Sequence, residues 1–128
     1  MGGAARDGTP VPALVVLGPG AAAESAPVDP ARVLGGAPVT TVANAYSDAG
    51  ARFHCGTWSS TPGAWRVSYT EHEFCHLLEG RVRLVADDGT AREFAAGDAW
   101  VIPAGFRGTW ETLEPARKYY AIYEAVDG

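Results

Sequence analysis

Glu73-Phe-Cys-His-Leu-Leu-Glu-Gly80 and Gly97-Asp-Ala-Trp-Val-Ile-Pro-Ala-Gly105 are the two segments that decide the fold of this chain. The first places a glycine seven positions after a glutamate, and the second places Pro-x-Gly after a glycine and five further residues. Around them, short runs of β-branched and aromatic residues recur roughly every ten residues between Gly, Pro and Asp turn signals. This spacing predicts an all-β sandwich or barrel, and no segment fits a long helix.

The turn signals divide the chain into expected strands. We predict strands at residues 40–46, 52–58, 65–69, 73–79, 81–86, 91–94, 99–102, 108–113 and 118–124. Asp88-Gly89 lies between two of them and predicts a hairpin with a two-residue primed turn, because both residue types tolerate positive φ.

The first part of the chain is different in composition. Clusters of Gly, Ala and Pro in residues 1–38 predict an irregular N-terminal arm with short ordered pieces, which belongs to the same fold as the barrel domain at 39–128. Residues 10–17 are apolar and β-branched enough to add an edge strand to this barrel or to a neighbouring one. Residues 29–34 are expected to form one helical turn, with Asp29 as its cap and Pro30 at its first position.

Composition narrows the class of protein. The 128 residues, 47% of them apolar, suit one compact domain. A formal charge of −5 and the lack of any Lys/Arg run argue against nucleic acid as a partner. No apolar stretch approaches the ~20 residues of a membrane span, and the N-terminus does not look like a signal peptide, so we expect a soluble cytoplasmic protein. Cys55 and Cys75 are expected to be free thiols, although neighbouring strands would also allow a disulfide.

Four segments of the sequence resemble the cupin superfamily, and in particular the group that contains ureidoglycine aminohydrolase and ethanolamine-utilisation protein Q. They are Cys55-Gly-Thr-Trp-Ser-Ser-Thr-Pro-Gly63, Glu73-Phe-Cys-His-Leu-Leu-Glu-Gly-Arg-Val82, Pro103-Ala-Gly-Phe-Arg-Gly-Thr-Trp-Glu111 and Arg117-Lys-Tyr119, with Gly97-Asp98 between them. The resemblance implies a single double-stranded β-helix, or jelly-roll, barrel. Because barrels of this class commonly pair through edge strands, it also implies a homodimer.

The resemblance also locates the positions where metal-binding cupins carry ligands. Those ligands are His-x-His, a glutamate and a residue three positions after the glycine of Pro-x-Gly. In this sequence they fall on Glu73, on Gly108 and on either Val67 and Tyr69 or Arg66 and Ser68, and strand alternation favours the apolar pair as the inward one. Only the glutamate is a ligand of the usual kind, so no metal ligand set and no cofactor are predicted.

Strand alternation further predicts which side chains line the barrel. The expected lining is Trp65, Val67, Tyr69, Glu73, Cys75 and Trp110, which describes a largely apolar small-molecule site with a few polar groups. We predict that Trp65, Val67, Cys75 and Trp110 bind the ligand. As a nucleophile Cys75 would need a lowered pKa, and no histidine is placed to lower it, so a small buried apolar residue is the favoured interpretation.

Three side chains are the predicted catalytic group: Glu73, Tyr69 and Lys118. Glu73 would act as the general acid or base and Tyr69 as a hydrogen-bond donor. Lys118, the only lysine, would pair with Glu73 or bind a substrate carboxylate if it points inward. The structural alternatives are a Glu73 that only bonds Tyr69 or a backbone amide and a Lys118 in solvent.

Three functions are consistent with these residues. The first is a metal-free or metal-poor enzyme of isomerase, lyase or hydrolase type that acts on a small polar metabolite. The second is a noncatalytic module that binds a small ligand in the same barrel. The third is a metal-dependent enzyme with an unusual site built from Glu73, His72 or Cys75. For the first function, Glu73→Gln is expected to abolish turnover and leave the fold intact.

Overall fold

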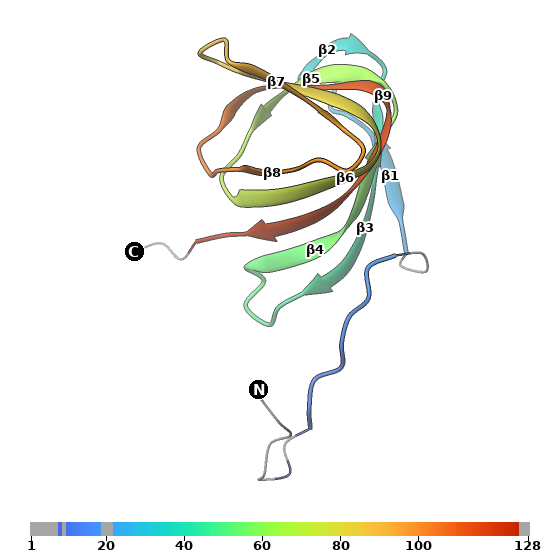
Figure 1. Cartoon of the computed structure of the whole chain (residues 1–128), viewed down its shortest axis with the longest axis vertical. Helices are drawn as coiled ribbons and strands as arrows, with labels where there is room; N and C mark the ends of the chain where they lie inside the picture. Colours follow the sequence, from blue (N-terminus) through green and yellow to red (C-terminus); the bar gives the residue numbers. More distant parts are fainter. Residues whose placement is uncertain (1–7, 9, 19–21, 126–128) are drawn as a thin grey trace.

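The computed structural model describes residues 8, 10–18 and 22–125, and the regular elements within them are all strands (Figure 1). They are β1 (Glu24–Pro27), β2 (Val33–Gly36), β3 (Val39–Ser47), β4 (Phe53–Ser60), β5 (Gly63–Ser68), β6 (His72–Ala86), β7 (Ala91–Ala95), β8 (Ala99–Ile102) and β9 (Arg107–Tyr123). This confirms the all-β class. No helix in the described residues is long and apolar enough to cross a membrane.

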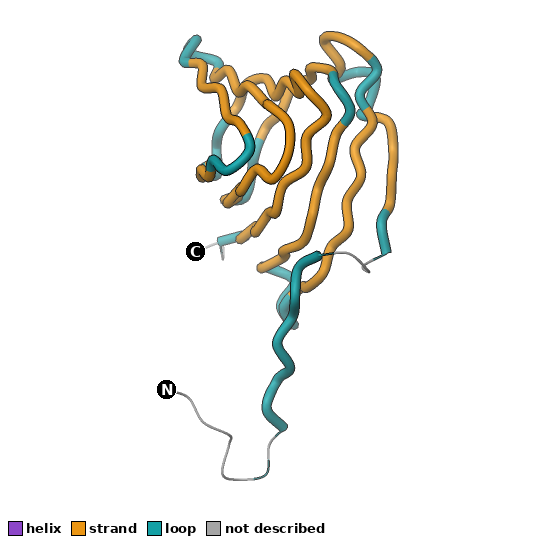
Figure 2. Tube along the Cα trace, turned by 45° about the vertical axis from the view of Figure 1, so that its right-hand side comes forward, coloured by secondary structure: helices purple, strands orange, loops and turns teal. Residues whose placement is uncertain are grey.

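The strands form one antiparallel sheet that curls into two leaves (Figure 2). The long strands β6 and β9 pair with each other and run through both leaves. The first leaf has the order β1-β3-β4-β9-β6-β8, and it uses residues 116–123 of β9. The second leaf has the order β2-β5-β9-β6-β7, and it uses residues 107–112 of β9.

Strands β6 and β9 are each continuous where the sequence predicts two strands. The predicted break in β6 falls at Gly80, which has φ +87° and lies beside the backbone of β9. A Cβ added there would lie 2.2 Å from the carbonyl oxygen of Pro115, so only glycine fits. Register shifts on either side of Gly80 allow the paired strands to pass from one leaf to the other without ending.

The predicted hairpin at Asp88-Gly89 is present, but its turn is not of the predicted type. The loop consists of Asp87, Asp88 and Gly89, closed by hydrogen bonds from Gly89 N to Ala86 O (2.8 Å) and from Ala86 N to Thr90 O (2.8 Å). Gly89 has φ +92°, whereas Asp88 does not have positive φ. The extra aspartate makes this a three-residue loop in which glycine takes the left-handed position, so the two-residue primed turn was wrong.

The N-terminal arm is partly ordered against the barrel. Strands β1 and β2 pair with β3 and β5. The predicted helical turn at residues 29–34 is wrong, because residues 30–32 form a simple turn and β2 begins at Val33, although Ala31 N donates to Asp29 Oδ1 (3.0 Å) as expected of a cap. Residues 10–17, by contrast, form no strand on their own barrel, which corrects that part of the edge-strand prediction. Pro10 and Pro12 have no N–H to give to a ladder. Residues 1–7, 9 and 19–21 of the predicted arm lie outside the described residues.

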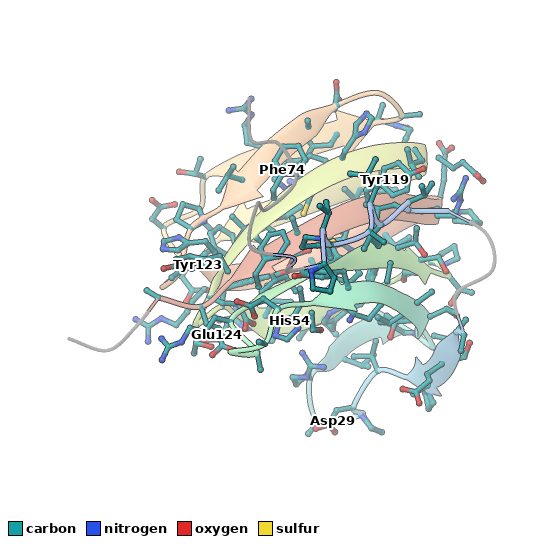
Figure 3. All side chains as sticks on the ribbon, turned by 90° about the horizontal axis from the view of Figure 1, so that it is seen from below. Asp29, His54, Phe74, Tyr119, Tyr123 and Glu124 are labelled. Carbon is teal, nitrogen blue, oxygen red and sulfur yellow. The ribbon has the colours of Figure 1, made fainter. Side chains whose placement is uncertain are left out.

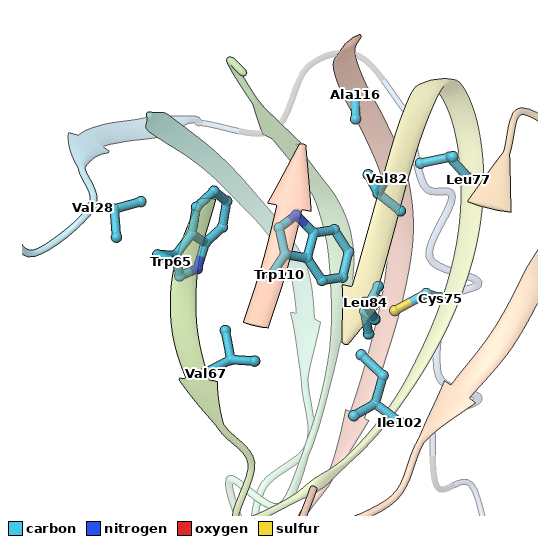
Figure 4. Packing of buried hydrophobic residues seen from close by; sticks show 10 residues of the cluster. All are labelled: Val28, Trp65, Val67, Cys75, Leu77, Val82, Leu84, Ile102, Trp110 and Ala116. Carbon is cyan, nitrogen blue, oxygen red and sulfur yellow. The ribbon is translucent and has the colours of Figure 1, made fainter. Parts of the chain in front are cut away.

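The hydrophobic core lies between the two leaves (Figure 4). It consists of Val28, Trp65, Val67, Cys75, Leu77, Val82, Leu84, Ile102, Trp110 and Ala116. Cys55 and Cys75 are both free, as expected. The alternation of burial along β5, with Trp65 and Val67 buried and Arg66 and Ser68 exposed, confirms which residues face the barrel.

Candidate functional site

A buried ion pair joins the two leaves' shared strands at the centre of the barrel. Lys118 on β9 and Glu73 on β6 both point inward, and Lys118 Nζ donates to Glu73 Oε2 at 2.7 Å. Only 3% of the lysine side chain and 9% of the glutamate side chain are exposed. Charged side chains are rarely buried to this degree unless they are paired, and here each is the other's partner.

Aromatic rings and a thiol complete the surroundings of the lysine. The Nζ atom lies 4.7 Å from the ring centroid of Trp58 and 4.4 Å from that of Trp110, both of which are cation–π distances. It also lies 3.3 Å from Cys75 Sγ. Burial by itself would lower the pKa of Lys118, but the neighbouring ionisable groups Cys75, Glu73 and Tyr69 outweigh it and raise that pKa above its usual value. Lys118 is therefore a cation at neutral pH.

Cys75 lies behind the ion pair and not on the cavity wall. Its side chain has no exposed surface, and burial raises the pKa of the thiol to about 12. The protonated thiol donates to Glu73 Oε2 at 3.4 Å. A thiol that stays protonated is a poor nucleophile, and its position corrects the prediction that Cys75 would line the pocket.

A cavity of about 530 Å³ opens above the pair, between the first leaf, β5 and the turn that follows β1. Its walls combine aromatic and apolar side chains with a few polar groups, and they are formed by Pro27, Val28, Asp29, Arg32, Thr40, Val42, Asn44, His54, Trp58, Trp65, Val67, Ser68, Tyr69, Glu71, Glu73, Trp110, Lys118, Tyr120 and Ile122. The volume lies within the range of small-molecule sites. Six of the seven predicted site residues are among these, and Cys75 is the exception.

The aromatic wall and the tyrosine have defined geometry. The rings of Trp65 and Trp110 stack at 6.4 Å with an interplanar angle of 30°, and they stand together in Figure 4. Trp110 Nε1 donates to Thr112 Oγ1 (3.0 Å), which fixes the indole. Tyr69 lines the cavity without a hydrogen bond to Glu73, and burial is the main cause that raises the pKa of its phenol. Tyr69 thus remains a hydroxyl donor at neutral pH.

Only one of the two oxygens of the Glu73 carboxylate accepts hydrogen bonds from the described residues. Its Oε2 atom accepts the bonds from Lys118 and Cys75, whereas Oε1 accepts none from the residues that the structure describes. Although Oε1 has no hydrogen-bond partner, it is not fully buried. Glu73 lines the cavity, so Oε1 is accessible from it. One acceptor of a buried carboxylate therefore faces the space where a ligand would lie.

Other wall residues were missed by the sequence analysis. Asn44 Oδ1 accepts the hydroxyl of Tyr120 at 2.7 Å, and His54 is held at the rim by Ser47 Oγ (2.6 Å). Asp29 comes from the N-terminal arm, where it was predicted only as the cap of a turn and where no alternation can assign a face. Asn44 could have been predicted as a wall residue, because alternation along β3 places it on the same face as Val42.

The residues at the metal positions of related barrels do not fit a divalent metal. Val67 and Tyr69 face the cavity, and the ammonium of Lys118 occupies the neighbourhood of Glu73. At Gly108 an added Cβ would lie 2.1 Å from the carbonyl oxygen of Val85, so a side chain needs a backbone shift. Among the described residues, no three His, Cys, Asp or Glu side chains form a metal-binding group.

A family model for the EutQ-like cupin domain matches residues 47–120, which is more than half of the chain. The chain belongs to the EutQ-like cupin family. This confirms the resemblance found in the sequence, and the cupin match contains β4 to β8 with most of β9.

Solved structures of other proteins share the fold of this chain. A protein of unknown function of the DUF861 family from Pseudomonas syringae pv. tomato is 28% identical with a TM-score of 0.74, over 83% of this chain and 46% of that one. This cupin thus spans less than half of that relative. The EutQ proteins of Clostridium difficile and Salmonella typhimurium are each 19% identical, with TM-scores of 0.62 and 0.61, over 69% and 68% of this chain and 64% and 71% of theirs. At that identity they show the shared fold alone. None of the curated proteins compared with the chain matches it.

Proposed function

We propose that this cupin binds a small polar metabolite in its cavity and acts on it without a metal, as an isomerase, lyase or hydrolase that uses Glu73 as acid or base. The observation that carries the proposal is the ion pair of Glu73 and Lys118 at 2.7 Å, buried under a cavity of about 530 Å³. A buried ion pair is weak support for stability, because apolar residues of similar size often do as well or better. Its position under an open cavity favours a role in chemistry.

The contacts divide the work between the three groups. Oε1 of Glu73 would accept a proton or a hydrogen bond from an N–H, O–H or C–H group of the ligand. Lys118 is already held by Glu73, Cys75 and two indole faces, so we assign it the task of positioning Glu73 and compensating its charge instead of binding a substrate carboxylate. Tyr69 would donate its hydroxyl to an oxygen or nitrogen of the same ligand.

Because Glu73 and Lys118 form a buried ion pair, the single variant Glu73→Gln is a poor test of the proposed function. Glu73→Gln alone would leave the ammonium of Lys118 buried without its counter-charge, so we no longer expect the fold to be untouched. The better variant replaces both members as Glu73→Gln with Lys118→Met, which keeps the volume and removes both charges. Matched to it is Glu79→Gln, which removes a carboxylate from the same strand at an exposed ion pair with Arg117.

The experiment follows a panel of small polar metabolites by proton NMR with the wild type, the double variant and Glu79→Gln. Quenching of tryptophan fluorescence reports binding, because three tryptophans line the cavity. We expect at least one compound to be converted by the wild type and by Glu79→Gln and not by the double variant. A compound that binds all three proteins without forming product would instead identify a noncatalytic binding module.

A further inference from the structure

A second cavity, of about 290 Å³, lies between the edges of the two leaves. Strand β7 is the edge of the second leaf and β8 is the edge of the first, and both pair with β6. The second cavity shares no lining residue with the cavity above Glu73. In Figure 3, Asp29 of the first cavity and the pale orange strands β7 and β8 lie at opposite ends of the molecule. The two cavities are therefore separate sites.

The walls of the second cavity are largely apolar, and they differ in how firmly they are held. The rings of Phe94 and Trp100 stack at 3.9 Å with an interplanar angle of 7°. Trp100 Nε1 is buried and has no hydrogen-bond partner among the residues that the structure describes, so packing alone holds this indole. Phe106 lies in a turn that is fixed to Tyr69, because Tyr69 N donates to Phe106 O (2.9 Å) and Gly105 N donates to Tyr69 O (2.7 Å). The cavity thus has one fixed wall and one ring that can shift.

Arg92 is the only charged residue in these walls. It lies opposite Leu84 in the ladder, and Leu84 is buried in the core, so Arg92 is on the inner face of β7. Its guanidinium forms no ion pair with a described residue, and its Cζ lies 5.9 Å from the centroid of the Phe94 ring. The first cavity has three carboxylates in its walls, whereas this one has none. The second cavity is therefore positive in a chain whose formal charge is −5.

We propose that the second cavity binds a small apolar carboxylate, which packs an aromatic or branched aliphatic body against Phe94 and Trp100 and places its charged group on Arg92. A dry apolar cavity of about 150 Å³ accepts a benzene ring, so about 290 Å³ leaves room for a ring and a short acid chain. A guanidinium binds a carboxylate through two parallel hydrogen bonds. A shift of the Trp100 ring would also bring its N–H to an acceptor on the ligand, which removes the cost of an unpaired buried donor.

An inward charge on an edge strand has a second known role, which is to prevent pairing with the edge of another chain. That role needs neither a cavity nor aromatic rings beside the charge. It predicts that Arg92→Met changes aggregation and leaves the affinity for every small molecule as it was. The affinity for a carboxylate therefore separates the two roles of Arg92.

The test titrates phenylacetate into the nitrogen-15-labelled full chain and follows the indole N–H signals of its four tryptophans by NMR. We expect a saturable shift of the Trp100 signal, with a dissociation constant of about 0.1–1 mM for a ligand of this size. Phenylacetamide has the same shape without the charge, and it should bind roughly fivefold more weakly or worse. The aliphatic acid 3-methylbutanoate should shift the same signal.

Three variants locate the site. Arg92→Met keeps the length of the side chain without its charge, so it should weaken phenylacetate binding by about tenfold or more and remove the preference for the acid over the amide. Arg83→Met is the matched control, because Arg83 is exposed on the other face of the same leaf, opposite Glu93, and it should bind as the wild type does. Glu73→Gln combined with Lys118→Met should also bind phenylacetate normally, since both changes lie in the first cavity.

These outcomes do not depend on the proposed catalytic role of Glu73. The absence of a saturable Trp100 shift with both phenylacetate and 3-methylbutanoate up to about 10 mM would overturn the second site. Equal affinities for phenylacetate and phenylacetamide, or an unchanged affinity in Arg92→Met, would do the same. Shifts confined to Trp58 and Trp65 would place the acid in the first cavity and would also contradict the proposal.

Discussion

The two faces of the first leaf invert the usual distribution of side chains. On the inner face of β6, Glu73 is buried against Lys118, whereas on the outer face of the same strand Phe74 is 46% exposed. Neither arrangement favours an isolated, stable barrel, since apolar residues are usually inside and charges outside. The difference indicates that neither face is arranged for stability alone, and in our proposal the inner face serves a ligand in the cavity.

The inner face should respond most strongly when only one member of the pair is removed. Glu73→Gln or Lys118→Met each leaves a buried charge without its partner, so either variant should lose about 3–5 kcal/mol of unfolding free energy in urea denaturation. The control is Glu79→Gln on the same strand, whose ion pair with Arg117 is exposed and should be worth less than about 1 kcal/mol. If Glu73→Gln and Glu79→Gln lower the free energy of unfolding equally, the buried ion pair contributes no more to stability than the exposed one.

The next largest effect on the inner face is a loss of stability at high pH. Burial raises the pKa of Cys75 from 9.0 to about 12, so the thiol stays protonated in the folded protein while it ionises in the unfolded chain. The stability that this pKa shift contributes is present in full below pH 9. As the pH rises toward 12, the free energy of unfolding falls by about 2–4 kcal/mol. The raised pKa values of Tyr69 and Lys118 act in the same direction at still higher pH. In Cys75→Ala, the fall that starts near pH 9 should disappear.

The outer face should show the smallest effect on the barrel itself. Phe74→Glu should stay within about 1 kcal/mol of the wild type, because nearly half of the Phe74 side chain is in solvent. A Phe74→Glu barrel that unfolds readily would show that this residue is required by the fold.

The sequence was sufficient for the barrel and for the direction of its side chains. Alternation along β5 and β6 identified the inward positions of Trp65, Val67 and Glu73, because a half-buried strand leaves a period of two in its residues. The interior orientation of Lys118 was left open, since alternation alone could not tell which face of the last strand is inside. Its contact with Glu73 depends on the register of β9 against β6, which bulges near Gly80 shift.

Other features depended on chemistry that has no local pattern. Continuous β6 and β9 were read as four strands, because glycine and proline mark a corner between leaves as readily as a strand end. Segment 10–17 was predicted to be a strand from its apolar residues, although its prolines remove the donors that a ladder needs. The wall residue Asp29 entered the site through a turn that only the tertiary structure places.

The central claim is that the pair of Glu73 and Lys118 is present for function and not for stability, and urea denaturation of the variant that combines Glu73→Gln with Lys118→Met tests it most directly. We expect the double variant to recover most of what each single variant loses and to unfold within about 1 kcal/mol of the wild type, because apolar and neutral groups replace a buried ion pair at little cost. If the double variant is instead as unstable as the single ones, the pair is required by the fold and its burial says nothing about catalysis.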